Sequence, residues 1–343
     1  MERLGWVILV LLCLSPDRAL AQALFDVKPV AEGVYAAMAR PHRPENGNSA
    51  FVLLDDGVLV VDTASTPSSA RALIAEIRKL TPKPVKWIVN THFHWDHYWG
   101  NQAFVEAFSN VEIISSERTR LDVERMGLGN ALLARWSIEI PATIADWKRQ
   151  LEQTTELDRR QRLTERIQGW EVALPELKAM RPAMPTLTFE RRVVLHSGAR
   201  TVELLWLGRG HTAGDVVVYL PQERVMATGD LLAGDTPYIA DITPYEWIRT
   251  LEALEKLDFD IAIPGHGEVM GGKEKLLLWK EYFRDLMAET ESAYAAGATL
   301  EDAVKRVSAR LVEKYRNRFG ADFPQAVEGN VSATYRIVSG QQN

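Results

Sequence analysis

The segment Thr91–His97 places four side chains of metal-binding type within six residues. His92 and His94 are two positions apart and follow an apolar run. On an extended backbone, residues two apart point to the same face, so both imidazoles can reach one ion. Asp96 and His97 come where the chain must turn, and they can face a second position. Imidazole and carboxylate are suitable zinc ligands, so this spacing predicts a metal site rather than a histidine-rich surface loop.

Three later segments each place a further ligand-type residue beside glycine. They are Gly208–Asp215 with His211, Thr228–Leu231 with Asp230, and Pro264–Gly267 with His266. Each follows a predicted strand, and glycine allows the backbone to turn tightly beside a site. Each segment is a weak signal alone. In this order, the segments predict one centre of five histidines and two aspartates, which is enough for two catalytic metal sites that share a carboxylate.

Short apolar runs alternate with amphipathic stretches around these motifs, which predicts an α/β fold. In the first half, strands are predicted at 34–38, 50–63, 85–89 and 111–115, and a helix at 66–80. In the second half, strands are predicted at 186–196, 201–207, 216–220, 224–228 and 260–263, and a helix at 244–257. Each half therefore carries hairpins, a helix and a strand that ends in a polar loop.

Residues from about 117 to 182 differ from both halves, because they are rich in Arg, Glu, Leu, Gln and Trp with few strand signals. They predict two or three helices, one of which includes Trp147–Trp170. We interpret them as a helical insertion in a domain of residues 22–272, rather than as a separate domain or a coiled-coil arm, and residues 273–343 as helices packed on that domain. Three residues of the insertion are lid candidates, with ordinary helix-surface roles favoured: Arg125, Trp136 and Trp147.

The first 21 residues are typical of an export signal. Arg3 supplies a charge, Leu4–Leu14 is almost wholly apolar, and Ala19-Leu20-Ala21 offers a cleavage pattern. The apolar run is too short to span a bilayer comfortably, so cleavage before Gln22 is favoured over an uncleaved anchor. The mature protein is then expected to be periplasmic or secreted. The single cysteine, Cys13, lies in this signal, so neither disulfides nor cysteine ligands are expected.

Composition points to an ordinary soluble protein that acts on a small molecule. Hydrophobic residues make up 46% and charged residues 25% of the chain. The net charge is −6, and no run of lysine or arginine stands out. A nucleic-acid partner is therefore not expected. No stable membrane span is expected once the signal is removed, and a homo-oligomer is compatible with the sequence.

These motifs resemble the metallo-β-lactamase-fold hydrolases over roughly residues 30–115 and 186–270. The resemblance implies a four-layer αβ/βα sandwich with the metals between two central sheets, here with a helical insertion and a helical C-terminus. It implies two Zn²⁺, with Fe or Mn as other candidate metals. The implied ligands are His92, His94 and His211 on one ion, Asp96, His97 and His266 on the other, and Asp230 between them. Asp62 matches an acidic residue that supports the metal loop, with a helix cap as the alternative.

The implied chemistry is hydrolysis by a metal-bridging hydroxide that attacks an ester-like or amide-like bond, such as an ester, lactone or thioester. Asp96 and Asp230 would orient that hydroxide, which makes them the candidate catalytic residues. Three further residues are candidates for the substrate pocket, with packing as the alternative for the tryptophans: His42, Trp95 and Trp99.

The branch of the family stays open between several alternatives. Zinc β-lactamases of the cysteine-bearing subclass have cysteine where Asp230 stands and a lysine three residues later, where this chain has Ala233. The glyoxalase II, lactonase, alkylsulfatase and phosphoesterase branches share the bridging aspartate, so β-lactam hydrolysis ranks second. A mononuclear iron persulfide dioxygenase and a non-catalytic binding protein are the remaining alternatives. The second ligand set argues against the dioxygenase.

Overall fold

The computed structural model describes residues 24–40, 47–127, 130–181, 183–234, 236–239, 243–320 and 323–341. The predicted signal, its cleavage site and His42 lie outside these residues, so export of the chain stays a prediction. Among the described helices, none has the length and apolar character needed to cross a membrane.

The first sheet has seven strands in chain order. They are β1 (Phe25–Ala31), β2 (Val34–Ala39), β3 (Ser49–Leu53), β4 (Val58–Val61), β5 (Val85–Val89), β6 (Glu112–Ser116) and β7 (Leu187–Phe189). The first four form an antiparallel meander, and β4 to β7 pair in parallel. Parallel pairing brings the carboxyl ends of β4, β5 and β6 to one edge of the sheet.

The second sheet has six strands and contributes the other loops of that edge. They are β8 (Arg192–Ser197), β9 (Arg200–Leu205), β10 (Val217–Leu220), β11 (Val225–Gly229), β12 (Ile261–Pro264) and β13 (Met270–Gly271). Neighbours pair antiparallel except β11 and β12, which are parallel. The loops after β11 and β12 therefore leave the sheet together.

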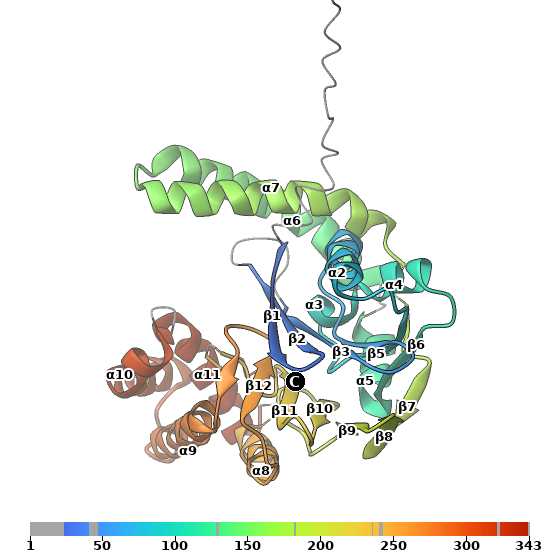
Figure 1. Ribbon diagram of the computed structural model, residues 1–343. Helices are drawn as coiled ribbons and strands as arrows, with labels where there is room; N and C mark the ends of the chain where they lie inside the picture. Colours follow the sequence, from blue (N-terminus) through green and yellow to red (C-terminus); the bar gives the residue numbers. More distant parts are fainter. Residues whose placement is uncertain are drawn as a thin grey trace, which may run out of the picture.

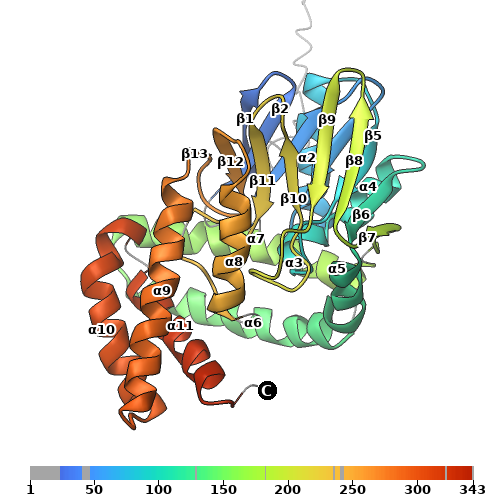
Figure 2. The same ribbon diagram turned by 90° about the horizontal axis from the view of Figure 1, so that it is seen from below.

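The two sheets pack face to face, with helices on both outer sides (Figures 1 and 2). One buried cluster joins the inner faces of the sheets and includes Val61, Val89, Val218 and Ile263. The first sheet is covered by α2 (Pro67–Leu80) and α4 (Asn101–Ala107), with α3 (Trp95–Tyr98) and α5 (Glu117–Asp122) at its edge. The second is covered by α8 (Pro244–Glu255), α9 (Glu274–Ala295), α10 (Leu300–Phe319) and α11 (Phe323–Val338). This is the expected four-layer α/β sandwich with a helical C-terminus.

The sequence signals for α2 show why the elements begin where they do. Thr66 is the N-cap, and its hydroxyl accepts a hydrogen bond from the Ser69 amide at 3.1 Å. Pro67 then occupies the first helical turn, where its missing N–H costs nothing. Arg78 and Lys79 lie in the last turn, where positive charge is favoured. The cap is therefore Thr66, and the capping alternative for Asp62 is wrong.

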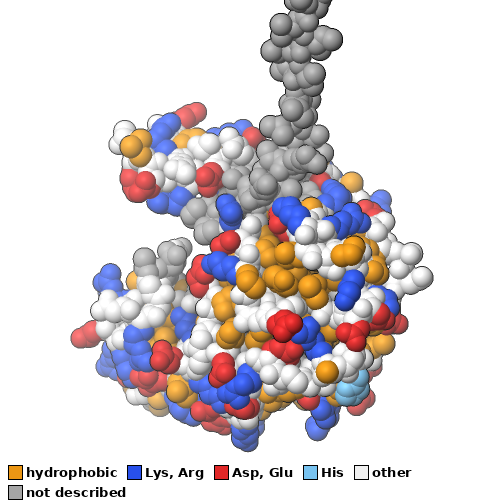
Figure 3. Space-filling model, viewed as in Figure 1, with side chains coloured by type: hydrophobic (Ala, Val, Ile, Leu, Met, Phe, Trp, Pro, Cys, Tyr) orange, Lys and Arg blue, Asp and Glu red, His pale blue; other side chains and the backbone are white. Residues whose placement is uncertain are grey.

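The insertion forms a helical hairpin in place of the single helix expected across Trp147–Trp170. After the π-helical turn η1 (Val123–Gly127), α6 (Asn130–Gln153) and α7 (Leu157–Ala179) lie side by side. The turn between them is closed by Arg160, whose guanidinium donates to the carbonyls of Leu151 and Thr154. These bonds satisfy carbonyls that the end of α6 leaves unpaired. Figure 3 shows one end of the hairpin projecting from the body, with an open gap between that end and the C-terminal helices.

Candidate metal centre

The structure brings all seven predicted ligands to the shared edge of the two sheets. His92 and His94 follow β5, and the next turn of chain, α3, carries Asp96 and His97. The other three come from loops of the second sheet: His211 between β9 and β10, Asp230 after β11, and His266 after β12. Their ligand-type atoms form two groups, each within 4.8 Å: His92, His94, His211 and Asp230, and Asp96, His97 and His266.

The carboxylate of Asp230 lies between the two groups. Its Oδ2 is 3.4 Å from His211 Nε2 and 3.8 Å from His92 Nε2, both in the first group. The same oxygen is 3.2 Å from His266 Nε2, and Oδ1 is 3.4 Å from His97 Nε2, both in the second group. A single carboxylate therefore faces both candidate cation positions, as a bridging ligand must.

The remaining ligands complete each group at short range. In the first group, His94 Nδ1 and His211 Nε2 are 2.8 Å apart. In the second, Asp96 Oδ2 lies 3.3 Å from His266 Nε2 and 3.5 Å from His97 Nε2. Nitrogen and carboxylate oxygen donors converge in both groups, which is the donor set that zinc and similar divalent metals take in catalytic sites.

Unsatisfied buried atoms show that these residues fit two cations. His92 Nε2, His97 Nε2 and Asp230 Oδ1 are buried, and none has a hydrogen-bond partner within the described part of the chain. Each such atom costs about 1–3 kcal/mol when left alone. All three point toward the groups described above, where a cation would satisfy them.

Asp62 orients the metal loop from behind. Its carboxylate accepts three hydrogen bonds of 2.8 Å, from His97 Nδ1 and from the amide and hydroxyl of Thr91. The Thr91 hydroxyl also lies 3.0 Å from His92 Nδ1. Both imidazoles are thereby held with Nε2 toward the centre, as supporting groups do in metal sites. Asp62 adopts φ 57°, an uncommon conformation for a residue other than glycine.

Two glycines leave room for the bridging carboxylate and its loop. A Cβ on Gly265 would lie 2.1 Å from Asp230 Oδ1. Gly229 has φ +50°, and a Cβ there would lie 2.4 Å from the Thr91 hydroxyl. These positions explain why the Gly-Asp and Gly-His pairs recur at the strand ends, since any side chain would displace the site.

In the absence of a cation, the carboxylates and histidines of the site shift one another's pKa values. Burial lowers the pKa of His97, but Asp96, Asp230 and Asp62 together raise it to about 9. Burial likewise opposes ionisation of Asp96, but His97 and His266 lower its pKa to about 2. The carboxylates therefore hold protons on His97 and His266, which a bound cation must displace, whereas burial lowers the pKa of His92.

The loop that carries His211 is fixed by residues with no predicted role. Asp215 is buried and accepts from the Thr212 amide at 2.9 Å and the Thr212 hydroxyl at 2.7 Å. The hydroxyls of Ser116 and Thr119 both donate to the Gly214 carbonyl. Burial raises the pKa of Asp215 to about 7. The sequence could have indicated this role of Asp215, because Asp215 ends the Gly-His-Thr-Ala-Gly-Asp segment that carries His211.

Comparison with known proteins agrees with this geometry. The model of the metallo-beta-lactamase superfamily matches residues 42–266. The chain belongs to the metallo-beta-lactamase superfamily. The matched range contains all seven candidate ligands, from His92 to His266.

Relatives within the superfamily include sulfatases. The chain is 28% identical to a linear primary-alkylsulfatase of Pseudomonas sp. (strain ATCC 19151) over 74% of this chain and 48% of that protein. It is 25% identical to the alpha subunit of a 2,4-dinitroanisole O-demethylase of Nocardioides sp. (strain JS1661), over 73% of this chain and 58% of that protein. The chain therefore spans about half the length of these relatives.

A solved structure supports the fold over nearly the whole chain. A stereoselective inverting sec-alkylsulfatase from Pseudomonas sp. matches with a TM-score of 0.62 and 19% identity, over 91% of this chain and 50% of that one. At this identity the likeness concerns the fold alone. Its extent shows that the helical C-terminus, and not only the superfamily core, has a counterpart in that structure.

A cavity of about 420 Å³ opens beside the two ligand groups. It is bounded by five candidate ligands and six other residues: His94, Asp96, His211, Asp230, His266, Trp95, Ala233, Thr236, Pro237, Tyr238 and Trp279. Tyr238 is 65% exposed, and its ring centroid lies 6.5 Å from that of His211. Tyr238 was missed by sequence reasoning, because nothing local distinguishes it from other loop tyrosines.

The tryptophans beside the ligands divide between cavity and core. Trp95 lines the cavity as predicted. Trp99 is fully buried, so its assignment to the substrate pocket is wrong. Its ring centroid lies 5.4 Å from that of Trp95, and the ring centroid of Trp95 lies 6.2 Å from that of Trp170 in the hairpin. The hairpin thus packs on the metal loop through a shared apolar cluster.

The lid candidates of the insertion gain no support from their positions. Trp147 belongs to the same apolar cluster, and the Arg166 guanidinium lies 4.5 Å from the centre of its ring. Arg125 is exposed on η1. The side chain of Trp136 lies outside the description. Neither Arg125 nor Trp147 is among the described residues that line the cavity.

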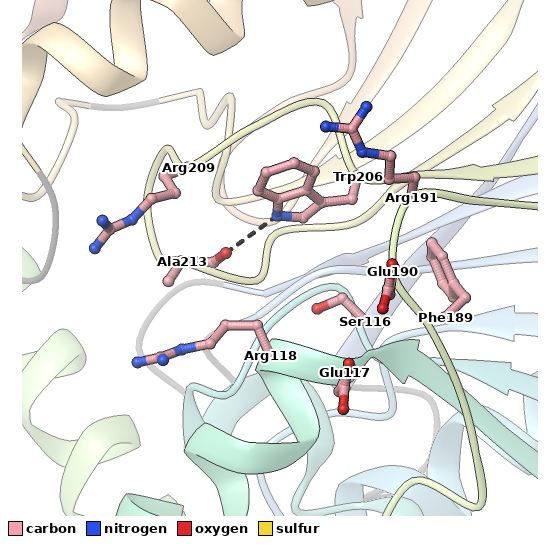
Figure 4. A pocket seen from close by; sticks show the side chains of 9 residues that line it. All are labelled: Ser116, Glu117, Arg118, Phe189, Glu190, Arg191, Trp206, Arg209 and Ala213. Atoms are coloured by element: carbon pink, nitrogen blue, oxygen red, sulfur yellow. Dashed lines mark hydrogen bonds between the residues drawn. The ribbon is translucent and has the colours of Figure 1, made fainter.

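A second cavity, of about 500 Å³, is lined in part by Arg209 and Ala213, which belong to the loop that carries His211 (Figure 4). Arg118 and Arg209 line it, but they are paired with Asp122 at 2.9 Å and Glu246 at 3.2 Å. Carboxylates also line it, so its charge is mixed and indicates no ligand class. Trp206, which also lines this cavity, supports the loop, because its indole N–H donates to the Ala213 carbonyl at 3.1 Å.

Proposed function

We propose that the protein is a dizinc hydrolase of ester-like bonds, and that sulfate esters of alkyl alcohols are its first candidate substrates. The observation that carries the proposal is the carboxylate of Asp230 between two complete ligand groups, beside a cavity of about 420 Å³. Three protein ligands per cation leave positions open for water and substrate, which is typical of catalytic sites.

The chain supplies the arrangement, and the cations supply the reactivity. When bound, two divalent cations lower the pKa of a water and polarise an oxygen of the substrate. Asp62 keeps His97 in the tautomer that presents Nε2, and Asp230 fixes the two groups relative to each other. Asp96 is a further carboxylate at the cavity and a candidate for handling the proton that leaves the water.

The cavity walls favour an anionic head with an apolar body. No lysine or arginine is among the described residues that line the cavity, so the cations themselves would attract a negative group. Trp95 and Tyr238 offer apolar surface beside them. An alkyl sulfate has this division, and the resemblance to an alkylsulfatase over 74% of the chain supports the same class. β-Lactams rank second, because Ala233 cannot pair with their carboxylate.

The test measures metal content and substrate range together. The zinc-loaded chain is assayed with decyl sulfate, p-nitrophenyl acetate, a lactone and a chromogenic β-lactam. We expect two zinc ions per chain and sulfate release from decyl sulfate. Asp230→Ala and His94→Ala should lower turnover more than about hundredfold, whereas Glu117→Gln in the second cavity should leave it unchanged.

Several outcomes would contradict the proposal. Undiminished turnover in Asp230→Ala would exclude the shared centre. One iron and no zinc per chain would favour the mononuclear dioxygenase. Two bound zinc ions with no turnover of any substrate would favour a binding protein. Turnover of the β-lactam alone would reverse the order of the two substrate classes.

A further inference from the structure

The loop after Asp230 forms one wall of the metal cavity. Thr236, Pro237 and Tyr238 line the cavity from this side, and Tyr238 is the exposed member. These residues belong to neither a helix nor a strand. Their position therefore depends on contacts with other parts of the chain.

The main support of this wall comes from Asn330 on α11, in the C-terminal helices (Figure 2). Its side-chain amide Nδ2 donates to the Pro237 carbonyl at 2.8 Å, and its Oδ1 accepts from the Ile239 amide at 3.1 Å. These two bonds hold the backbone on both sides of Tyr238. Asn330 is 2% exposed, and Nδ2 also donates to the Tyr282 hydroxyl at 2.9 Å, which orients the amide.

The rest of the loop is anchored at both ends. The Gly234 amide donates to the His266 carbonyl at 2.7 Å, close to the metal groups. Ile239 is buried in the apolar cluster that also contains Val327 and Val331 of α11. The wall therefore extends from the loop of a metal ligand to the last helix of the structure.

We propose that Asn330 is a positioning residue that sets this wall, so that the C-terminal helices take part in the choice of substrate. The inference rests on the proposed function, in that the cavity must receive the substrate. Asn330 acts through Pro237 and Ile239, which flank Tyr238. Its own polar contacts are with the loop backbone and Tyr282.

Asparagine suits this position because one side chain carries both an acceptor and a donor. Leucine has a similar volume but no polar atoms, so the Ile239 amide and the Pro237 carbonyl would be buried without a hydrogen-bond partner. The two groups could regain hydrogen bonds only if the loop moved toward water. The proposed device therefore depends on the amide and not on the volume of the side chain.

Hydrogen exchange resolved to single amides tests the support directly. In the wild-type protein, the Ile239 amide should exchange slowly. Asn330→Leu and Asn330→Ala should speed it at least about tenfold, which is about 1.4 kcal/mol of local opening, while amides of β4 stay unchanged. Thr334→Val is the matched control. Thr334 lies one turn later on α11, and its buried hydroxyl has no partner within the described residues.

Two results would overturn the support by Asn330. One is a wild-type Ile239 amide that exchanges as fast as an unstructured one, and this measurement needs no variant. The other is unchanged exchange at Ile239 in a folded Asn330 variant. Both results concern the loop alone, so they are independent of whether the protein hydrolyses anything.

Kinetics on decyl sulfate and butyl sulfate test the effect on substrate choice. Asn330→Leu should raise KM about fivefold or more and change the ratio of kcat/KM between the two chain lengths, while kcat and zinc content stay within about twofold. Tyr238→Ala should produce the same change, and adding Asn330→Leu to it should have little further effect. Unchanged KM and chain-length preference, with faster exchange at Ile239, would overturn the role in substrate choice. Absence of turnover in the wild-type protein would instead contradict the proposed function.

Discussion

Asp62 shows how one buried carboxylate can orient a whole metal loop. It sits in the left-handed region of backbone conformation, at 2% exposure, where it collects donors from Thr91 and His97. Burial raises the pKa of Asp62, whereas His97 and Thr91 oppose that effect. Because all three of its hydrogen bonds go to the metal loop, removal of this carboxylate should affect the metal more than the fold.

We expect Asp62→Ala to weaken zinc binding about 10- to 100-fold, because His97 would lose the bond that sets its tautomer and direction. Competition with a chromophoric chelator measures this change. Thr66→Ala is the control, since loss of the α2 cap should cost about 1 kcal/mol of stability without altering zinc affinity. Equal zinc affinity in Asp62→Ala and the wild-type protein would refute the supporting role.

Protonation of Asp215 should make the stability of the metal-free protein depend on pH. Burial raises its pKa from 3.8 to about 7, so the folded state favours the neutral acid. The contribution is fully present below about pH 4 and is lost as the pH rises through 7. We expect the free energy of unfolding to fall over this range by at most about 4 kcal/mol.

Asp215→Asn is the control, because asparagine cannot ionise. In this variant the free energy of unfolding should not show the part of the fall with pH that Asp215 causes. Chemical unfolding at pH 4.5, 6 and 8 gives both curves. If the difference in free energy of unfolding between the two proteins does not change with pH, Asp215 is already ionised in the folded state and the argument fails.

At the residue scale, the sequence predicts what is local and misses what is not. The seven candidate ligands were predictable because residue type, spacing and adjacency to strands and glycines are all visible in the chain. Trp99 was misassigned because proximity to ligands in sequence does not say which side of α3 a ring occupies. Asn330 was missed because it meets Pro237 across 93 residues of chain.

At the element scale, the metal loop depends on the inserted hairpin. Trp95 begins α3, next to Asp96, and its ring lies against Trp170 of α7. The cluster around them draws apolar side chains from α3, α6 and α7. The insertion therefore contributes to the shape of the ligand loop, even though Arg125 and Trp147 are not among the described residues that line the cavity.

We expect Trp170→Ala to lower the free energy of unfolding by about 1–3 kcal/mol, since it leaves a partly buried cavity beside Trp95. It should also weaken zinc binding, because Asp96 adjoins Trp95. Val172→Ala, an exposed change on the same helix, should alter neither quantity. Urea unfolding and zinc titration give both values, and a Trp170 variant as stable as the Val172 variant would disprove the packing role.

Sequence patterns did not predict β1 or the break between α6 and α7, for physical reasons. β1 is an edge strand that contains Pro29, and its burial does not alternate cleanly. The break between α6 and α7 is set by Arg160, which contacts carbonyls up to nine residues earlier. The strands that were predicted, such as β5 and β10, are short and strongly apolar runs.

At the scale of the whole molecule, the candidate centre joins the two sheets. Four of its ligands come from the first sheet's loops and three from the second. Without cations, His92 Nε2, His97 Nε2 and Asp230 Oδ1 are buried at this junction with no hydrogen-bond partner among the described residues. Bound metal should therefore stabilise the assembly of both halves.

We expect removal of divalent metal with a chelator to lower Tm by roughly 5–10 °C, and added zinc to restore it. A ligand present at about a thousand times its Kd contributes about 4 kcal/mol, which in a chain of this size corresponds to a shift of that order. Differential scanning calorimetry measures the shift. His94→Ala should respond less to zinc, because it removes a ligand of one group only, and an equal Tm of the wild-type protein with and without metal would contradict a cation at the junction.

The separation of the ligands along the chain has a consequence for how the protein is made. His94 and His211 are 117 positions apart, and His266 comes later still. The first group is complete only after residue 230 has emerged and the second only after residue 266, and each group draws ligands from the loops of both sheets. We therefore expect both groups to bind metal only after the two sheets have met, so that bound metal reports that the halves of the molecule are assembled.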